Sequence, residues 1–199
     1  MKRLLLGIAM LLIFLQTQAQ SDIQELAFDT SFVFTDLQLA LKNASQVRHL
    51  NLSRKNLRAF PLELAALPNL ISLDLSRNRI KTIPDTIATL KALEVLNLSR
   101  NGMDELNAAI GELSSLTTLI ISRNNLVFIP TSFGKLKHLS YLDLWDNNLS
   151  TLPDELAELK ELKILDLRGI LFSQTEHERF KALVPNANVL LSPSCNCKN

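Results

Sequence analysis

Residues 70–80 read LISLDLSRNRI, and residues 93–103 repeat the same pattern as LEVLNLSRNGM after an interval of 23 positions. Laid out with this period, the chain aligns as successive rows without a gap. The six rows begin at Val47, Leu70, Leu93, Leu116, Leu139 and Leu162. A fixed period of this length indicates a stacked repeat architecture, because a single unit is too short to bury its own apolar side chains.

The two halves of a row predict different local structures. In Leu73-Asp74-Leu75 apolar and polar residues alternate, so both leucines face one side of a short strand and Asp74 faces the other. The Asn78 amide can donate to and accept from backbone groups of the following turn. The second half of a row, as in 84–90, spaces proline and apolar residues three apart, which suits a helical or 3₁₀ turn. We therefore predict an α/β solenoid, curved, with a concave parallel sheet, convex short helical turns and a capping helix at each end.

The rows over 47–172 resemble leucine-rich repeats, in the 23-residue Leu-Pro-x-x-Leu subtype seen in Ras-group-type and many bacterial secreted repeat proteins. The resemblance implies a curved solenoid that binds a macromolecule, usually another protein, on its concave face. A particular partner is not inherited with a fold, so its identity stays open.

Composition excludes several classes of protein. The chain has 21 Lys and Arg against 20 Asp and Glu, a balance that argues against nucleic-acid or anionic-membrane binding. A hydrophobic content of 47% with 21% charged residues excludes intrinsic disorder. Leucine is abundant while Trp and Tyr occur once each, which indicates that one apolar residue fills a repeated position.

The first residues are typical of a secretory signal peptide over 1–19. Lys2 and Arg3 precede an apolar run over 4–15, and cleavage is expected after Ala19. The run is shorter than the ~20 residues that a membrane-spanning helix needs. We therefore expect a secreted or periplasmic protein with no membrane insertion after cleavage.

The segments on either side of the rows are predicted to cap the solenoid. Over 20–46 we expect a flexible leader followed by a helix over 35–43, with Thr35 as its N-cap and Gln38 completing a capping box. Capping of exposed solenoid ends is required for solubility.

After the rows, 173–199 is expected to form the second cap and a tail. It contains a helix over 176–183 and a closing strand over 189–191. Cys195 and Cys197 follow in the tail, either as labile thiols or as a covalent link to another molecule.

The single Tyr and single Trp, Tyr141 and Trp145, lie four residues apart at outward positions of row five. Neither occupies a leucine position, so the core does not require them. Exposed aromatic residues beside aliphatic ones are typical of a binding hot spot. The alternative is that Trp145 covers the sheet edge or Ser122. The other outward residues assigned to this candidate patch are Asp143, Ile120, Val95 and Ile164.

A second outward column carries four arginines at the spacing of the rows. One interpretation is a track that binds carboxylates, sulfates or phosphates. The other is a solvated stripe offset by Asp74 and Glu94. The column, named the arginine ladder below, consists of Arg54, Arg77, Arg100 and Arg123.

Catalytic chemistry is poorly represented. His49, Ser72 and Asp74 could approach one another, but on an open sheet without a pocket that excludes water. Motifs for phosphate loops, dinucleotides and metal sites are missing, so neither cofactor nor metal is expected. The favoured function is an exported, non-enzymatic protein-binding module. Binding of an acidic glycan through the arginine ladder, and structural self-assembly at the cell envelope, are the alternatives.

Overall fold

The computed structural model describes residues 32–194. The predicted signal peptide over 1–19, the predicted flexible leader over 20–30, and Cys195 and Cys197 lie outside these residues. The boundaries proposed for the segments of the chain therefore remain predictions.

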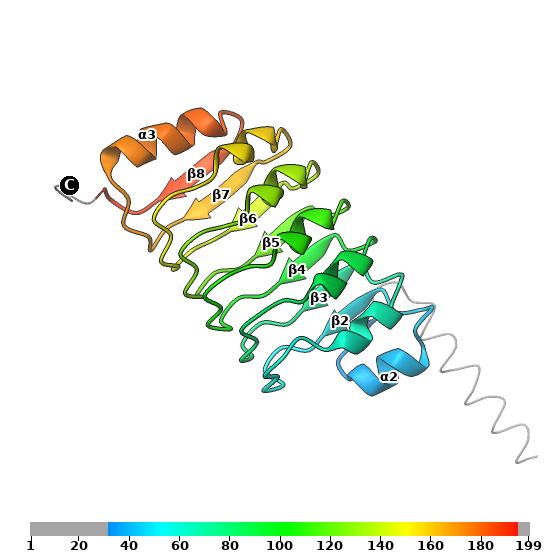
Figure 1. Ribbon diagram of the computed structural model, residues 1–199. Coiled ribbons are helices and arrows are strands. Elements are labelled where there is room, and N and C mark those ends of the chain that lie inside the picture. The colour runs from blue at the N-terminus through cyan, green and yellow to red at the C-terminus, as the bar shows by residue number, and fades with distance from the viewer. Residues whose placement is uncertain (1–31, 195–199) are drawn as a thin grey trace, which may run out of the picture.

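Within residues 32–194, eight parallel strands form one open sheet whose order in space is the order in the chain (Figure 1). Neighbouring rows align without a slip, so that Leu73 pairs with Leu50 on one side and with Leu96 on the other. The 23-residue period is thus the register of the sheet. The strands are β1 (Val33–Phe34), β2 (His49–Asn51), β3 (Ser72–Asp74), β4 (Val95–Asn97), β5 (Thr118–Ile120), β6 (Tyr141–Asp143), β7 (Ile164–Leu167) and β8 (Asn188–Leu191).

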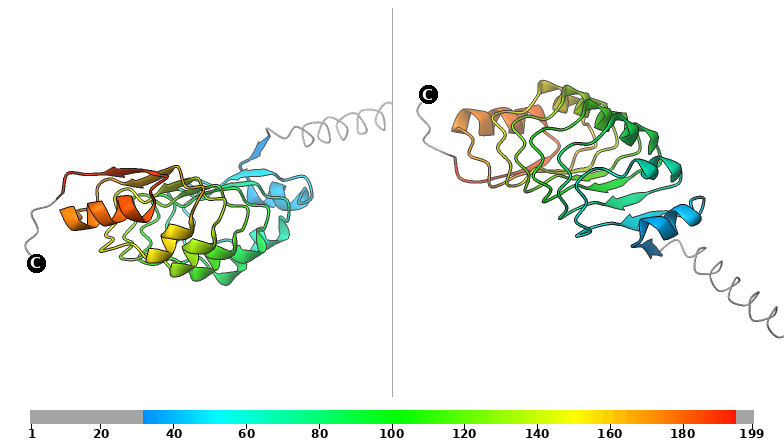
Figure 2. Two further views of the ribbon diagram at one scale, coloured as in Figure 1. Left: turned by 90° about the horizontal axis from the view of Figure 1, so that it is seen from above. Right: turned by 60° about the horizontal axis from the view of Figure 1, so that its bottom comes forward.

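Short 3₁₀ helices return the chain from each strand to the next, and Figure 2 shows them on the side opposite the sheet along a shallow arc. Four of the five have a proline as N-cap, whose carbonyl accepts the first hydrogen bond of the helical turn. The predicted convex layer is confirmed. The 3₁₀ helices are η1 (Leu62–Ala66), η2 (Asp85–Thr89), η3 (Ala108–Glu112), η4 (Thr131–Lys135) and η5 (Asp154–Glu158).

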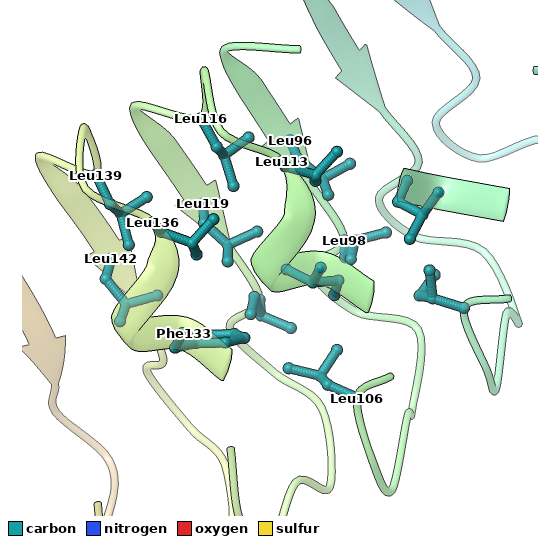
Figure 3. Packing of buried hydrophobic residues seen from close by; sticks show 14 of the residues in the cluster. Leu96, Leu98, Leu106, Leu113, Leu116, Leu119, Phe133, Leu136, Leu139 and Leu142 are labelled. Atoms are coloured by element: carbon teal, nitrogen blue, oxygen red, sulfur yellow. The ribbon is translucent and has the colours of Figure 1, made fainter. Parts of the chain in front are cut away.

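The core lies between the sheet and the 3₁₀ helices. Figure 3 shows Leu119 and Leu142 from neighbouring strands packing beside Leu113, Leu136 and Phe133 from the convex side. All five side chains are fully buried. Burying a leucine side chain stabilises the fold by about 1.5–3 kcal/mol, and here each row buries the leucines of its neighbours.

The repeated asparagines form a second buried column beneath the turns. Asn124 donates its amide to the carbonyls of Leu98 (3.2 Å) and Ile121 (2.8 Å), and its own carbonyl accepts from the backbone N–H of Asn101 (3.1 Å) and Met103 (3.0 Å). The predicted role of the asparagine amide is confirmed. Equivalent bonds are made by Asn78, Asn101 and Asn147.

At the N-terminal end, helix α2 (Leu37–Lys42) begins one residue later than the capping box predicts. The N-cap is Asp36, whose carboxylate accepts from the Leu39 N–H at 2.7 Å, so the prediction of Thr35 as N-cap is wrong. Both residues are good N-caps, but Asp36 is the last with extended backbone. Strand β1 was not predicted, because two residues carry no readable alternation.

At the C-terminal end, helix α3 (Gln174–Leu183) and strand β8 close the solenoid, as predicted. Helix α3 begins two residues earlier than expected because the Ser173 hydroxyl caps the N–H of Glu176 at 3.3 Å. No helix in residues 32–194 is long and apolar enough to cross a membrane.

Candidate partner-binding face

The outward side of β6 and the residues just after it carry the predicted aromatic patch. Tyr141, Asp143 and Trp145 are half-buried, whereas the alternating Leu142 and Leu144 are fully buried in the core. The alternation along this strand therefore leaves the aromatic residues on the sheet side of the solenoid.

The register determines which of the other predicted residues join this patch. Ile164 pairs with Tyr141 across β6 and β7, and Ile120 pairs with Asp143 across β5 and β6. Val95 pairs with Thr118, one strand further away. Ile164 and Ile120 thus adjoin the aromatic residues, while Val95 lies two strands from Tyr141.

The Trp145 ring is held in place from both neighbouring rows. The Arg123 guanidinium lies 4.2 Å from the ring centroid, a cation–π contact. On the other side Gly169 has a φ of +77°, and a Cβ there would come within 3.0 Å of the ring. The backbone N–H of Trp145 donates to the Asp143 carboxylate at 2.9 Å, which fixes the main chain that carries the ring. An aromatic side chain fixed in this way loses little conformational freedom when a partner covers it.

An ion pair next to Tyr141 was not singled out from the sequence. Arg168 donates to Asp166 through Nη2 (2.6 Å) and Nε (3.0 Å), and the pair raises the pKa of Arg168. Burial raises the pKa of Tyr141, and the charges of Asp143 and Asp166 raise it further. Tyr141 therefore keeps its hydroxyl proton and can donate a hydrogen bond. The signal was available, because Asp166 and Arg168 occupy outward columns of row six.

Asp143→Asn is expected to stabilise the fold at pH 7. Burial raises the pKa of Asp143, and the hydrogen bonds from the Trp145 backbone and the Ser122 side chain offset only part of this effect. The folded state then binds the proton more tightly than the unfolded state, so ionisation as the pH rises above about 4 costs stability. Asparagine removes that cost and keeps an oxygen for the backbone N–H of Trp145. Thermal unfolding should show a higher Tm for the variant at pH 7 and no difference near pH 3. A difference that does not change with pH would contradict this account.

The arginine ladder continues the sheet beyond the ends of the strands. Arg54, Arg77 and Arg100 donate their backbone N–H to the serine carbonyl of the next row at 3.1, 2.8 and 3.0 Å. All four ladder residues have φ between +56° and +58°. This left-handed conformation costs a non-glycine residue roughly 1–2 kcal/mol. The left-handed conformation could have been inferred from the sequence, because the same column continues with Asp146 and Gly169. Glycine and aspartate both favour this conformation.

The charges of the ladder are largely unneutralised. Within residues 32–194, Arg54, Arg77 and Arg100 form no ion pair, whereas Arg123 lies 3.7 Å from Asp146. Partial desolvation, followed by the charges of the other three arginines, lowers the pKa of Arg100.

Asp74 and Glu94, the two carboxylates expected to offset the positive charge of the arginine ladder, form no ion pair with its arginines in the described part of the chain. Asp74 accepts from the backbone N–H of Ser76 at 2.8 Å, and Glu94 forms no ion pair in the described part of the chain.

The residues considered for catalysis lie on the open sheet. His49 pairs with Ser72 across β2 and β3, and Asp74 ends β3 on the same face. In the part of the chain that the structure describes, no three His, Cys, Asp or Glu side chains are grouped so that they could hold a metal ion.

Stacked rows, one parallel sheet in chain order and a buried asparagine column define a solenoid repeat protein. The family model for the leucine-rich repeat matches residues 45–103 and 114–169, and the chain belongs to the leucine-rich repeat family. Leucine-rich repeats serve in general as protein-interaction modules, and no catalytic family is evident. Among curated proteins, none matches the chain significantly in sequence.

Solved structures agree with this assignment. A leucine-rich-repeat protein of Leptospira interrogans is 28% identical with a TM-score of 0.66, over 83% of this chain and 49% of its own. Internalin C2 of Listeria monocytogenes is 27% identical with a TM-score of 0.63, over 79% of this chain and 66% of its own. The PEPR1–AtPEP1 structure is 31% identical with a TM-score of 0.54, over 65% of this chain and 18% of its own. The chain thus spans about half of the Leptospira protein and about two thirds of the internalin.

Proposed function

We propose that the chain is an exported, non-enzymatic module that binds another protein on its concave face, with Trp145 and Tyr141 as anchors. One observation carries the proposal: the only Trp and the only Tyr lie together outside the core, on the sheet side of a fold that supplies every other large apolar position with Leu, Ile, Val, Met or Phe. Trp, Tyr and Arg dominate the binding energy of protein interfaces.

The setting of the aromatic residues supports the same function. Trp145 is already held by Arg123 and Gly169, and Ile120 and Ile164 adjoin the patch. A rigid aromatic centre with aliphatic neighbours and a charged rim is the anatomy of a protein interface. The partner-binding set we propose also includes Asp143, Val95 and the arginine ladder.

Export is proposed from the sequence of 1–19, with cleavage after Ala19 and a secreted or periplasmic destination. The non-enzymatic character is proposed because leucine-rich repeats typically act as binding modules and because His49, Ser72 and Asp74 lie on the open face of the sheet. Among the similar structures, the one described as PEPR1–AtPEP1 names two components. Binding of a second component is also what we propose for this chain.

Two alternatives have their own expected results. Binding of an acidic glycan through the arginine ladder would be strongly weakened by salt and indifferent to loss of Trp145. Self-assembly at the envelope would appear as association that depends on concentration without any added partner.

The test is affinity capture of envelope and extracellular proteins by the wild-type chain and by two variants. Trp145→Ala should lose the captured protein, and Phe128→Ala should retain it. Phe128 is a matched control because its ring is 53% exposed and lies outside the strands. Full capture by the Trp145 variant, or loss only with the Phe128 variant, would refute the proposed face.

A further inference from the structure

The fold does not require arginine in the ladder. The same backbone position, with the same left-handed conformation, is occupied by Asp146 in row five and by Gly169 in row six. Glycine and aspartate tolerate a positive φ with less strain than arginine. Four arginines therefore stand where the backbone favours other residues, so their side chains call for an explanation outside the folding of the chain.

The ladder also lacks the charges that would neutralise it. Arg54, Arg77 and Arg100 are exposed and form no ion pair within residues 32–194. They lie one row apart, about 4.8 Å between strands, so they repel one another. Arg123 is paired weakly, and its Nε is buried without a hydrogen-bond partner among the described residues. A row of external carboxylates would relieve the repulsion and accept hydrogen bonds from the exposed guanidinium groups.

The ladder and the aromatic patch form one continuous track. Arg123, the last arginine of the ladder, stacks on Trp145 of row five. An occupant that lies across the strands therefore meets positive charge over rows one to four and an aromatic anchor in row five. This continuity favours a protein segment, which can present carboxylates and an apolar side chain along one line.

The spacing of the ladder decides between a helix and an extended segment. A helix presents the same face about every 5.4 Å, whereas an extended strand does so about every 6.8 Å. The three intervals from Arg54 to Arg123 span roughly 14 Å. Three turns of a helix are about 2 Å longer than this distance, and three two-residue repeats of an extended strand are about 6 Å longer. Flexible arginine side chains can absorb the first mismatch more readily than the second.

We propose that the arginine ladder binds a helix of the protein partner that carries acidic residues at i, i+4, i+7 and i+11, with an apolar residue one turn further on that rests on Trp145. The inference deepens the proposed function, on which it rests. It assigns the chemistry of the partner: an amphipathic helix with one acidic stripe.

The test uses two synthetic alanine-based helical peptides of identical composition, each ending in a leucine. One carries its four glutamates at i, i+4, i+7 and i+11, and the other distributes them around the helix. A sulfated polysaccharide is the third probe. The striped peptide should bind roughly tenfold more tightly than the distributed one, because several charge-assisted contacts act together. Equal affinity for both peptides, binding of the polysaccharide without either peptide, or no binding of any probe would overturn the inference.

Two paired variants separate recognition from folding. Arg77→Asn/Arg100→Asn should bind the striped peptide roughly tenfold more weakly. Its Tm should equal or exceed that of the wild type, since asparagine suits the left-handed backbone. Arg58→Asn/Arg79→Asn removes the same charge from exposed arginines outside the ladder and should change neither quantity. Unchanged peptide affinity in the first variant would overturn the inference.

Failure of this inference can be distinguished from failure of the proposed function. If a captured protein is lost with Trp145→Ala but both peptides fail, the concave face binds protein without an acidic helix. If the striped peptide binds while capture is indifferent to Trp145, the proposed anchor is wrong and the ladder acts alone, which contradicts the continuous track.

Discussion

Asn124→Ala is expected to lower the free energy of unfolding by about 2–5 kcal/mol, because it leaves two buried backbone N–H groups without partners at a cost of roughly 1–3 kcal/mol each. The groups are the backbone N–H of Asn101 and of Met103. The carbonyls of Leu98 and Ile121 also lose a bond, but each keeps one from the neighbouring asparagine amide. The site lies in the middle of the stack, where each row depends on both neighbours. Equilibrium unfolding in urea measures the change.

Asn125→Ala provides the matched control, one residue further on. Its side chain is exposed and bonds to Asp104 at 3.1 Å, so the expected change is below about 0.5 kcal/mol. A loss below 1 kcal/mol in the Asn124 variant would mean that the asparagine column is not a main source of stability.

Tyr141→Ala/Trp145→Ala is expected to weaken the affinity for the captured partner at least 100-fold, about 2.7 kcal/mol. Both side chains are half-buried and outside the leucine core, so the double variant should still unfold cooperatively with a modestly lower Tm. Isothermal titration with the purified partner measures the affinity, and circular dichroism verifies the fold.

Phe128→Ala is again the comparison, since it also truncates an exposed aromatic ring. A double variant that keeps its affinity within threefold of the wild type would exclude the patch as the anchor. Loss of affinity together with loss of the cooperative transition would assign the effect to misfolding, which the single variants Tyr141→Ala and Trp145→Ala then resolve.

The fold could be predicted from the sequence because each leucine position recurs with one period. The alternation around Leu73 and the amide of Asn78 specify a strand and a turn that only stacking can satisfy. The ends were less predictable. Thr35 and Asp36 are both good N-caps, and the one-residue choice depends on backbone geometry. Strand β1 pairs only through Val33 and Phe34.

The site could be predicted in part. Outward positions place Tyr141 and Trp145 on the sheet side, as the alternation indicates. Sequence could not supply the stacking of Arg123 on Trp145 or the pairing of Arg168 with Asp166, because side-chain contacts between rows depend on rotamers. The left-handed backbone of the ladder was readable only from Asp146 and Gly169 in the last two rows.

The most direct test of protein binding on the concave face is hydroxyl-radical footprinting of the chain with and without its captured partner. The single Trp and single Tyr make the oxidation of Trp145 and Tyr141 unambiguous, and Phe128 reports on the surface outside the strands. We expect strong protection of Trp145 and Tyr141 with unchanged oxidation of Phe128. Protection of Phe128 with unchanged oxidation of Trp145 and Tyr141 would contradict it.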